Sequence, residues 1–237
     1  MYSAMLAIYR REIRLYFNTP VAFIATIIFL LFVGWFFNST FFLQNAATVR
    51  TLFEVTPFAF LFFVPALTMK VFADELRSGT YDLMISKPVS LTGIITGKFL
   101  ATLTVVAVFL APTLLCVVLV SSLAPLDWGP VAGGYLGMIL LASIYASIGI
   151  FASTLTDNQI IAFITGFVIS FLFYIAGNFS MFLPQPLAMI TDFLSIDNHI
   201  RGILRGVVDT RDLVYAISMV TTFLTLAWMV LTHRREK

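Results

Sequence analysis

The charged side chains of this 237-residue chain are concentrated in one stretch, residues 70–98. The chain carries only 14 basic and 12 acidic residues, and seven of them lie there: Lys70, Asp74, Glu75, Arg77, Asp82, Lys87 and Lys98. Apolar side chains lie between these charges: Leu76, Tyr81, Leu83, Met84 and Ile85. Apolar groups set among charges are typical of a surface that docks another protein. A solvated loop between two membrane spans is an equally good interpretation of the composition.

No residue pattern in the sequence is typical of an enzyme active site. The motifs HExxH, CxxC and GxSxG do not occur, and the two histidines, His199 and His233, are far apart in the chain. The segment Gly93 to Phe99 (GIITGKF) is similar to a phosphate-binding loop, but it is one residue too short and has Phe99 at the magnesium-binding position. We therefore expect that the chain is not an enzyme and holds no metal or cofactor of its own.

The composition indicates a polytopic membrane protein of the all-α fold class. Hydrophobic residues make up 60% of the chain and charged residues 11%, whereas about a quarter of the residues of a soluble domain are charged. A membrane-spanning helix needs about 20 mostly apolar residues, and the charge-poor intervals of the chain predict six such spans. Their approximate bounds are 20–40, 54–73, 94–123, 131–154, 159–182 and 212–232. We expect them to form a single membrane domain over residues 1–237.

Residues 1–18 precede the first span and are too short and too polar to cross a membrane. They combine apolar residues with four charged ones: Arg10, Arg11, Glu12 and Arg14. This mixture predicts a helix that lies in the membrane interface, with its arginines among the lipid phosphates. For this helix, a function as a mere topology anchor and a role in gating are equally good interpretations.

An even number of spans places both termini on the same side of the membrane. If that side is the cytoplasm, ten Lys and Arg residues are cytoplasmic and four are outside, namely Arg50, Arg201, Arg205 and Arg211. The positive-inside rule favours this orientation. We therefore expect a multi-pass protein of a bacterial-type inner (plasma) membrane, with a cytoplasmic loop over residues 74–93 and an outer loop over residues 184–211.

The middles of the predicted spans contain no ionisable residue, which disfavours an ion channel or a proton-coupled carrier. In the fourth span, Gly133 and Gly137 form a GxxxG motif that lets another helix approach closely. We prefer packing within one bundle over a subunit interface as the use of this motif. Pro65 and Pro112 predict bends in the second and third spans.

The charged stretch also has local order of its own. The segment from Asp74 to Lys87 predicts one short helix that ends before Pro88. Ser90 or Thr92 is then expected to cap the helix of the third span.

Three segments of the chain, in order, resemble the ABC-2 type permeases, which are the membrane subunits of one class of ATP-binding-cassette transporter. The first segment matches the first cytoplasmic loop of that family through Glu75, Gly79, Thr80, Leu83, Pro88 and the pair Gly97 and Lys98. The second, Phe151 to Phe167, resembles the junction of spans four and five. The third, Gly202 to Tyr215, resembles the outer loop before the last span in the short six-span members, the gliding-motility and copper-maturation types.

The resemblance implies an exporter-like fold of the type V class, driven by ATP. Two permease subunits, identical or related, would face each other in the membrane, and separate cytoplasmic ATPase subunits would bind the ATP and magnesium. An additional membrane or extracytoplasmic subunit is a further partner known among the small members of the family.

In such transporters the first cytoplasmic loop carries a coupling helix that sits in a cleft of the ATPase. The resemblance assigns the ATPase-coupling role to Glu75, Arg77, Gly79, Thr80, Asp82, Leu83 and Pro88. It assigns a second cytoplasmic contact to Thr156, Asp157, Asn158 and Gln159. On this basis, reversal of the charge at Glu75 should uncouple ATP hydrolysis from transport without unfolding the bundle.

Two other functions fit the same sequence. The chain could be a secondary carrier that needs no ATPase, or a membrane scaffold or anchor for a motility or assembly complex. A nucleic-acid partner is not expected, because the net charge is only +2 and the basic residues are scattered.

Overall fold

The computed structural model describes residues 2–43, 48–85, 89–123 and 125–235 of the chain. Over these residues the ordered elements are all helical, and none is a strand. In chain order they are α1 (Tyr2–Asn18), α2 (Pro20–Leu43), α3 (Arg50–Thr68), α4 (Ala73–Arg77), α5 (Thr80–Ile85), α6 (Leu91–Leu110), the 3-10 helix η1 (Ala111–Thr113), α7 (Leu114–Leu123), α8 (Trp128–Leu155), α9 (Gln159–Ile175), the 3-10 helix η2 (Ala176–Phe182), α10 (Gln185–Leu194), α11 (Ile196–Leu204) and α12 (Thr210–Arg235).

Within the described residues, six helical segments are long and apolar enough to cross a membrane. They are Ala22–Thr40, Arg50–Arg77, Leu91–Leu123, Trp128–Leu155, Gln159–Ser180 and Thr210–Arg234. Each of them overlaps one of the spans predicted from the sequence. The predicted fold class, an all-α polytopic membrane protein, is confirmed.

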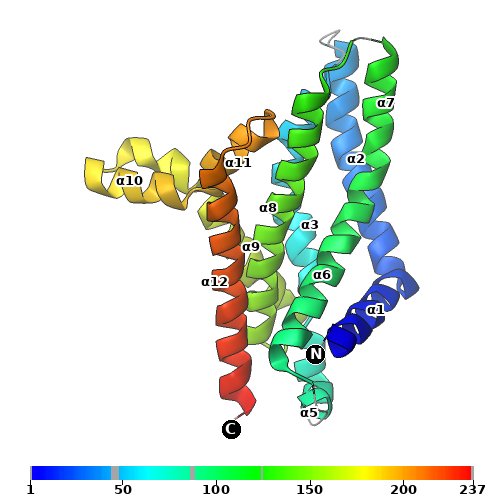
Figure 1. Ribbon diagram of the computed structural model, residues 1–237, viewed down its shortest axis with the longest axis vertical. Coiled ribbons are helices and arrows are strands. Elements are labelled where there is room, and N and C mark those ends of the chain that lie inside the picture. Colours follow the sequence, from blue (N-terminus) through cyan, green and yellow to red (C-terminus); the bar gives the residue numbers. More distant parts are fainter. Residues whose placement is uncertain (1, 44–47, 86–88, 124, 236–237) are drawn as a thin grey trace.

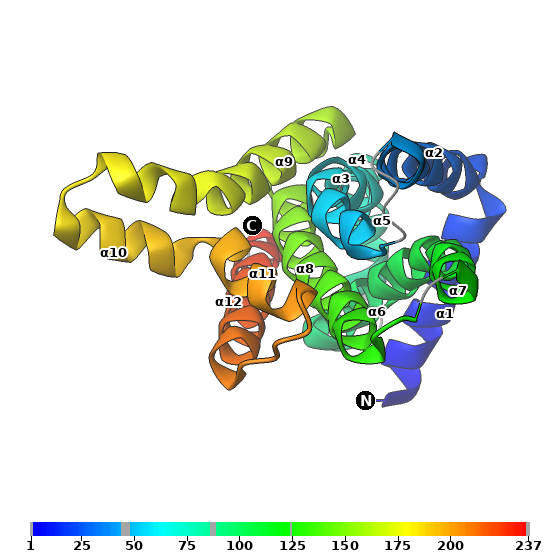
Figure 2. The same ribbon diagram turned by 90° about the horizontal axis from the view of Figure 1, so that it is seen from above.

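Helix α8 lies at the centre of the bundle, with α3, α6, α9, α11 and α12 packed around it (Figures 1 and 2). Its glycines allow close approach of other backbones, because a Cβ atom added at Gly133 would lie 2.5 Å from the Cα of Gly206. A Cβ atom at Gly137 would lie 3.1 Å from a methyl group of Leu204. The GxxxG motif therefore packs within one bundle, as preferred from the sequence.

The third span is interrupted near its middle. Pro112 lies in η1, a single 3-10 turn between α6 and α7. Proline has no N–H group to continue the α-helical hydrogen bonds, so a local change of helix type is expected there. Helix α3, by contrast, runs without a break through Pro57 and Pro65.

At the end of the bundle opposite to α4 and α5, the chain between α9 and α12 forms one part that projects from the bundle and one part that packs on it. The end of α9, η2 and α10 project sideways from the bundle (Figure 2), and no residue of α10 is buried. Helix α11 instead packs on α8 and is tied to the start of α12, since Nδ1 of His199 lies 2.8 Å from Oδ1 of Asp212. The imidazole of His199 also stacks on the ring of Tyr215, with 4.0 Å between the centroids.

Candidate functional site

The two short helices α4 and α5 lie at one end of the bundle, where α12 also ends (Figure 1). The prediction of one continuous helix from Asp74 to Lys87 is wrong, because the chain turns between α4 and α5. Gly79 has a φ of +68°, in the left-handed region that other residues rarely adopt. The prediction of a cap before α6 is confirmed at Ser90, whose Oγ accepts a hydrogen bond from the backbone N–H of Gly93 at 3.3 Å.

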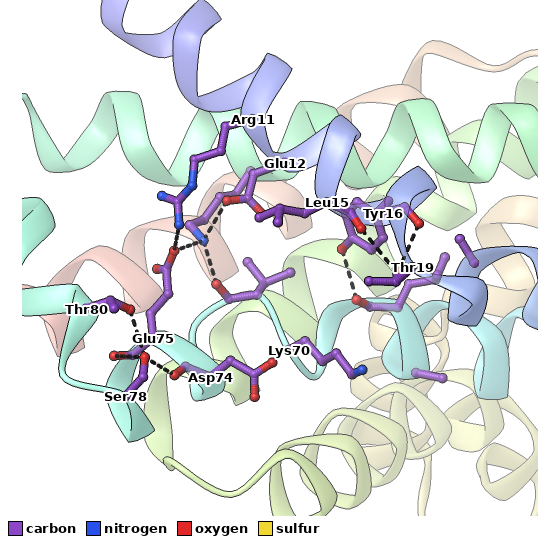
Figure 3. A pocket seen from close by; sticks show the side chains of 15 residues that line it. Arg11, Glu12, Leu15, Tyr16, Thr19, Lys70, Asp74, Glu75, Ser78 and Thr80 are labelled. Carbon is purple, nitrogen blue, oxygen red and sulfur yellow. Dashed lines mark hydrogen bonds and ion pairs between the residues drawn. The ribbon is translucent and has the colours of Figure 1, made fainter.

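A buried cluster of charged groups connects α4 with α1 and α6 (Figure 3). The ammonium of Lys98, whose side chain is 1% exposed, lies 2.9 Å from Oε1 of Glu75 and 3.2 Å from Oε1 of Glu12. It also donates a hydrogen bond to the carbonyl oxygen of Val71 at 2.6 Å and lies 4.9 Å from the ring centre of Phe72. One lysine side chain therefore holds together the first helix, the end of the second spanning segment and the start of the third.

The carboxylate of Glu75 is only partly satisfied by this cluster. Its residue is 7% exposed, and Oε1 lies 3.6 Å from the Arg11 guanidinium in addition to its contact with Lys98. Its second oxygen, Oε2, is buried and has no hydrogen-bond partner among the described residues. An unsatisfied buried carboxylate oxygen is costly, because it has lost its water without gaining a donor.

Helix α1 is fixed against the bundle by further contacts. The hydroxyl of Tyr16 donates a hydrogen bond to the carbonyl oxygen of Leu67 at 2.9 Å. Burial raises the pKa of the Tyr16 phenol, so that it remains a neutral donor. Gly97 allows α1 to approach α6, since a Cβ atom there would lie 3.0 Å from the Met5 carbonyl oxygen. The segment that resembles a phosphate-binding loop is thus part of a regular helix that packs on α1.

The turn between α8 and α9 lies beside α4. The side-chain amide of Gln159 donates a hydrogen bond to the carboxylate of Asp74. Asn158 caps α9, because its Oδ1 accepts a hydrogen bond from the N–H of Ile160 at 2.9 Å. Asp157, which directly precedes Asn158, is exposed.

Helix α5 packs against the end of α12. The hydroxyl of Tyr81 donates a hydrogen bond to the carbonyl oxygen of Leu231 at 3.1 Å, and Tyr81 is 3% exposed. Met84 is also buried, so only part of the predicted apolar surface is available. The guanidinium of Arg234 donates to the carbonyl oxygen of Leu155 at 3.0 Å, which joins the end of α12 to the end of α8.

The residues assigned from the sequence divide into exposed and buried ones. Arg77, Gly79 and Thr80 are exposed, and Leu83 is 68% exposed, whereas Glu75 is buried. Pro88 and the side chain of Asp82 lie outside the described residues. In the second segment, Asp157 and Asn158 are exposed, and Thr156 and Gln159 are half-buried.

Two residues of the buried cluster, Glu12 and Lys98, were missed as site residues by sequence reasoning. From the sequence, Glu12 was assigned only to the interfacial helix, and Lys98 was assigned to the cytoplasmic charges and to the matched family pattern but to no site. The signal that could have found Lys98 is its position, because it is followed by a charge-free run up to Leu126. A lysine at the start of a span needs a nearby anionic partner unless its ammonium reaches water.

A cavity of about 320 Å³ opens beside the cluster, between α1, the end of α3 and α4 (Figure 3). Its charged lining consists of three basic and three acidic residues: Arg11, Lys70, Lys98, Glu12, Asp74 and Glu75. Apolar side chains line the rest of it, among them Leu15, Ala66 and Leu67.

Residues 6–233 match the model of the ABC-2 family of transporter proteins. The chain belongs to this family. No curated protein matches it significantly. ABC-2 proteins are the membrane permease subunits of ATP-binding-cassette transporters, so this chain is a multi-pass permease subunit and the family implies an ATPase as its partner. The match extends over all six membrane-spanning segments and includes both α4–α5 and the turn before α9.

Proposed function

We propose that this ABC-2 permease is the membrane subunit of an exporter and that α4 and α5 couple it to a separate cytoplasmic ATPase. The observation that carries the proposal is the position of α4 and α5, which contact three other parts of the chain at one end of the bundle. These contacts are the Glu75–Lys98 ion pair, the Asp74–Gln159 hydrogen bond and the Tyr81–Leu231 hydrogen bond.

These contacts explain how a movement of α4 and α5 would reach the spans. An ATPase that closes on ATP can drive the permease only if it binds the two permease states with different free energies. A displaced α4 would carry α1 and α6 through Lys98, and α9 through Gln159. A displaced α5 would carry α12 through the carbonyl oxygen of Leu231. The side chains proposed for direct contact with the ATPase are the exposed ones at Arg77, Thr80 and Leu83, with Asp157 at the second segment.

The proposed orientation has both termini and α4–α5 in the cytoplasm of a bacterial-type inner membrane. It is supported by the distribution of the basic residues. Three of the four that are assigned to the outside, Arg50, Arg201 and Arg205, line one cavity of about 720 Å³. The segment before α3, the segment before α8 and helix α11 form this cavity. The other end carries Lys70, Arg77 and the arginines of α1, which gives it the larger share of basic residues.

A second copy of the chain is proposed to pack along α9. The outward side of this helix is apolar, with exposed side chains at Ile160, Ile161, Ile164, Val168 and Leu172. In a background in which Cys116 is replaced by serine, Leu172→Cys should form a disulfide-linked dimer in native membranes. Trp35→Cys on α2, which is 73% exposed, should remain monomeric. Equal cross-linking at both positions would contradict a contact along α9.

The coupling proposal is tested by Leu83→Asp. The tagged chain is purified from its native membrane in mild detergent, co-purifying proteins are identified, and ATP hydrolysis and transport are measured. We expect the wild-type chain to retain an ATPase subunit and Leu83→Asp to lose it. The thermal stability of the variant should be unchanged, because Leu83 is 68% exposed.

Val207→Asp is the matched control for this experiment. Val207 is 66% exposed and follows α11, at the opposite end of the bundle. The control should retain the ATPase and its activity. Normal transport by Leu83→Asp would contradict coupling through α5, and a chain that never retains an ATPase would favour the carrier or the scaffold.

A further inference from the structure

The cavity beside α1, α3 and α4 is lined by a carboxylate with an unsatisfied oxygen and by a half-buried cation. The oxygen is the buried Oε2 atom of Glu75, which has no hydrogen-bond partner among the described residues. The cation is the ammonium of Lys70, which lines the cavity and forms no ion pair within the part of the chain that the structure describes. A ligand that fills this cavity would therefore meet both a hydrogen-bond acceptor and a cation.

We propose that this cavity binds a zwitterionic phospholipid with a primary ammonium headgroup, of the phosphatidylethanolamine class. The ammonium of the lipid would donate a hydrogen bond to Oε2 of Glu75, and its phosphate would lie near Lys70 and the exposed side of Arg11. The proposal does not depend on transport or on the ATPase, because it rests only on the lining of the cavity.

The charge of the cavity favours a zwitterion over an anionic lipid. Its lining includes three basic and three acidic side chains, so it has no net charge. Lys98 is already engaged by Glu12, Glu75 and the carbonyl oxygen of Val71. An anionic lipid of the phosphatidylglycerol type would offer the carboxylate oxygen of Glu75 only neutral hydroxyl donors, which bind it more weakly than an ammonium does, and a simple cation would leave Lys70 unpaired.

The remaining walls and the position of the cavity suit a lipid. Leu15, Ala22, Ala66 and Leu67 line it with apolar groups on which an acyl chain can lie. The cavity is formed by the helix that precedes the first span and by the end of the second, which is the level expected for lipid headgroups. Its volume of about 320 Å³ is sufficient for a headgroup, since small-molecule sites begin at roughly 300 Å³.

Three lipids with identical acyl chains test the proposal. The delipidated chain is titrated with phosphatidylethanolamine, phosphatidylcholine or phosphatidylglycerol, and bound lipid is counted by native mass spectrometry. Choline carries no N–H group, so it cannot donate a hydrogen bond to Glu75. We expect one molecule of phosphatidylethanolamine per chain, bound about tenfold more tightly than either of the other lipids. Equal binding of the three lipids would overturn the proposal.

Variants of the cavity locate the bound lipid. Ala66→Phe fills the cavity and should abolish the tight site, and Lys70→Met should weaken phosphatidylethanolamine and phosphatidylcholine alike. Arg14→Met is the matched control, because Arg14 is exposed on α1 and does not line the cavity. Each variant is first checked for its wild-type melting temperature. Tight binding that survives Ala66→Phe in a folded protein would place the lipid elsewhere and overturn the proposal.

The free headgroup distinguishes a lipid from a soluble ligand of the same chemistry. Phosphoethanolamine shares the ammonium and the phosphate but has no acyl chain to lie on Leu15 and Leu67. We expect it to displace the lipid only at a large excess. Displacement at an equal concentration would assign the cavity to a soluble headgroup-like ligand and overturn the assignment to a lipid.

Discussion

The ammonium of Lys98 lies 2.9 Å from the carboxylate of Glu75, although the two residues belong to different helices and both are almost completely buried. Removing two charges from water is costly, so a buried pair adds little net stability by itself. Its effect lies in specificity, because any displacement of α4 relative to α6 would separate two desolvated charges. The pair therefore favours one position of α4 on the bundle.

Lys98→Met should destabilise the protein by about 3–5 kcal/mol, the usual cost of leaving buried charges without a partner. Both Glu12 and Glu75 would lose their contact with the ammonium, while the methionine side chain would fill a similar volume. The measurement is reversible unfolding in mixed detergent micelles, followed by circular dichroism. A loss below about 1 kcal/mol would mean that water reaches the cluster.

The triple variant Lys98→Met, Glu12→Gln and Glu75→Gln controls for this result. It removes all three charges of the cluster core together, so most of the lost stability should return. Lys70→Met removes a nearby lysine that has no ion pair among the described residues, and its stability should remain within about 0.5 kcal/mol of the wild type.

Glu75→Arg should lower the melting temperature rather than only uncouple the transporter. The new guanidinium would be buried beside Lys98 and Arg11, so three cations would meet where the wild type has a compensated cluster. The burial of Glu75 thus leads to a different expectation from that drawn from the sequence, in which the bundle would tolerate the change. Thermal melting in detergent checks it, with Arg77→Glu on the exposed side of α4 as the charge-reversal control. A wild-type melting temperature for Glu75→Arg would contradict the burial of this side chain.

The spans could be predicted from the sequence because an apolar stretch of about 20 residues has few possible structures in a membrane, and a spanning helix is the main one. Arg50–Arg77 was the hardest case, since Lys70 falls within it, and it was still found because a lysine near a span end can reach the interface. The packing role of Gly133 was also predictable, because a small residue in a membrane helix marks a close approach. Its partner, Gly206, was not, since it lies in a distant loop.

The details of the charged stretch could not be predicted in the same way. Composition shows that Glu75 and Arg77 are both charged, but it does not show which faces the bundle. Their different burial follows from the direction of a five-residue helix, which depends on tertiary contacts with α1 and α6. The turn at Gly79 was missed although Ser78 and Gly79 form a dipeptide that is frequent in turns, because an isolated glycine is also tolerated within a helix.

Gly149→Ala should destabilise the protein by about 1–3 kcal/mol, the usual cost of overpacking. A methyl group at this position would overlap the hydroxyl of Thr68, where α3 crosses α8. Gly34→Ala is the matched control, because a Cβ atom on this glycine of α2 would meet no other atom within 4 Å. The control should be neutral or more stable by up to about 1 kcal/mol, owing to the better helix propensity of alanine. Thr68→Ala should partly rescue Gly149→Ala, and absence of any rescue would contradict the contact.

Gly79→Ala should change coupling more than it changes the membrane bundle. Alanine in the left-handed conformation costs roughly 1–2 kcal/mol, and this cost falls on the turn that sets the angle between α4 and α5. A Cβ atom would meet no other atom within 4 Å, so the effect comes from the backbone alone. Gly79→Asn should be closer to the wild type, because asparagine tolerates this conformation better than alanine does. The measurement compares ATP hydrolysis and transport by the two variants with their melting temperatures. If alanine and asparagine behaved alike in all three assays, the positive φ at Gly79 would have no part in coupling.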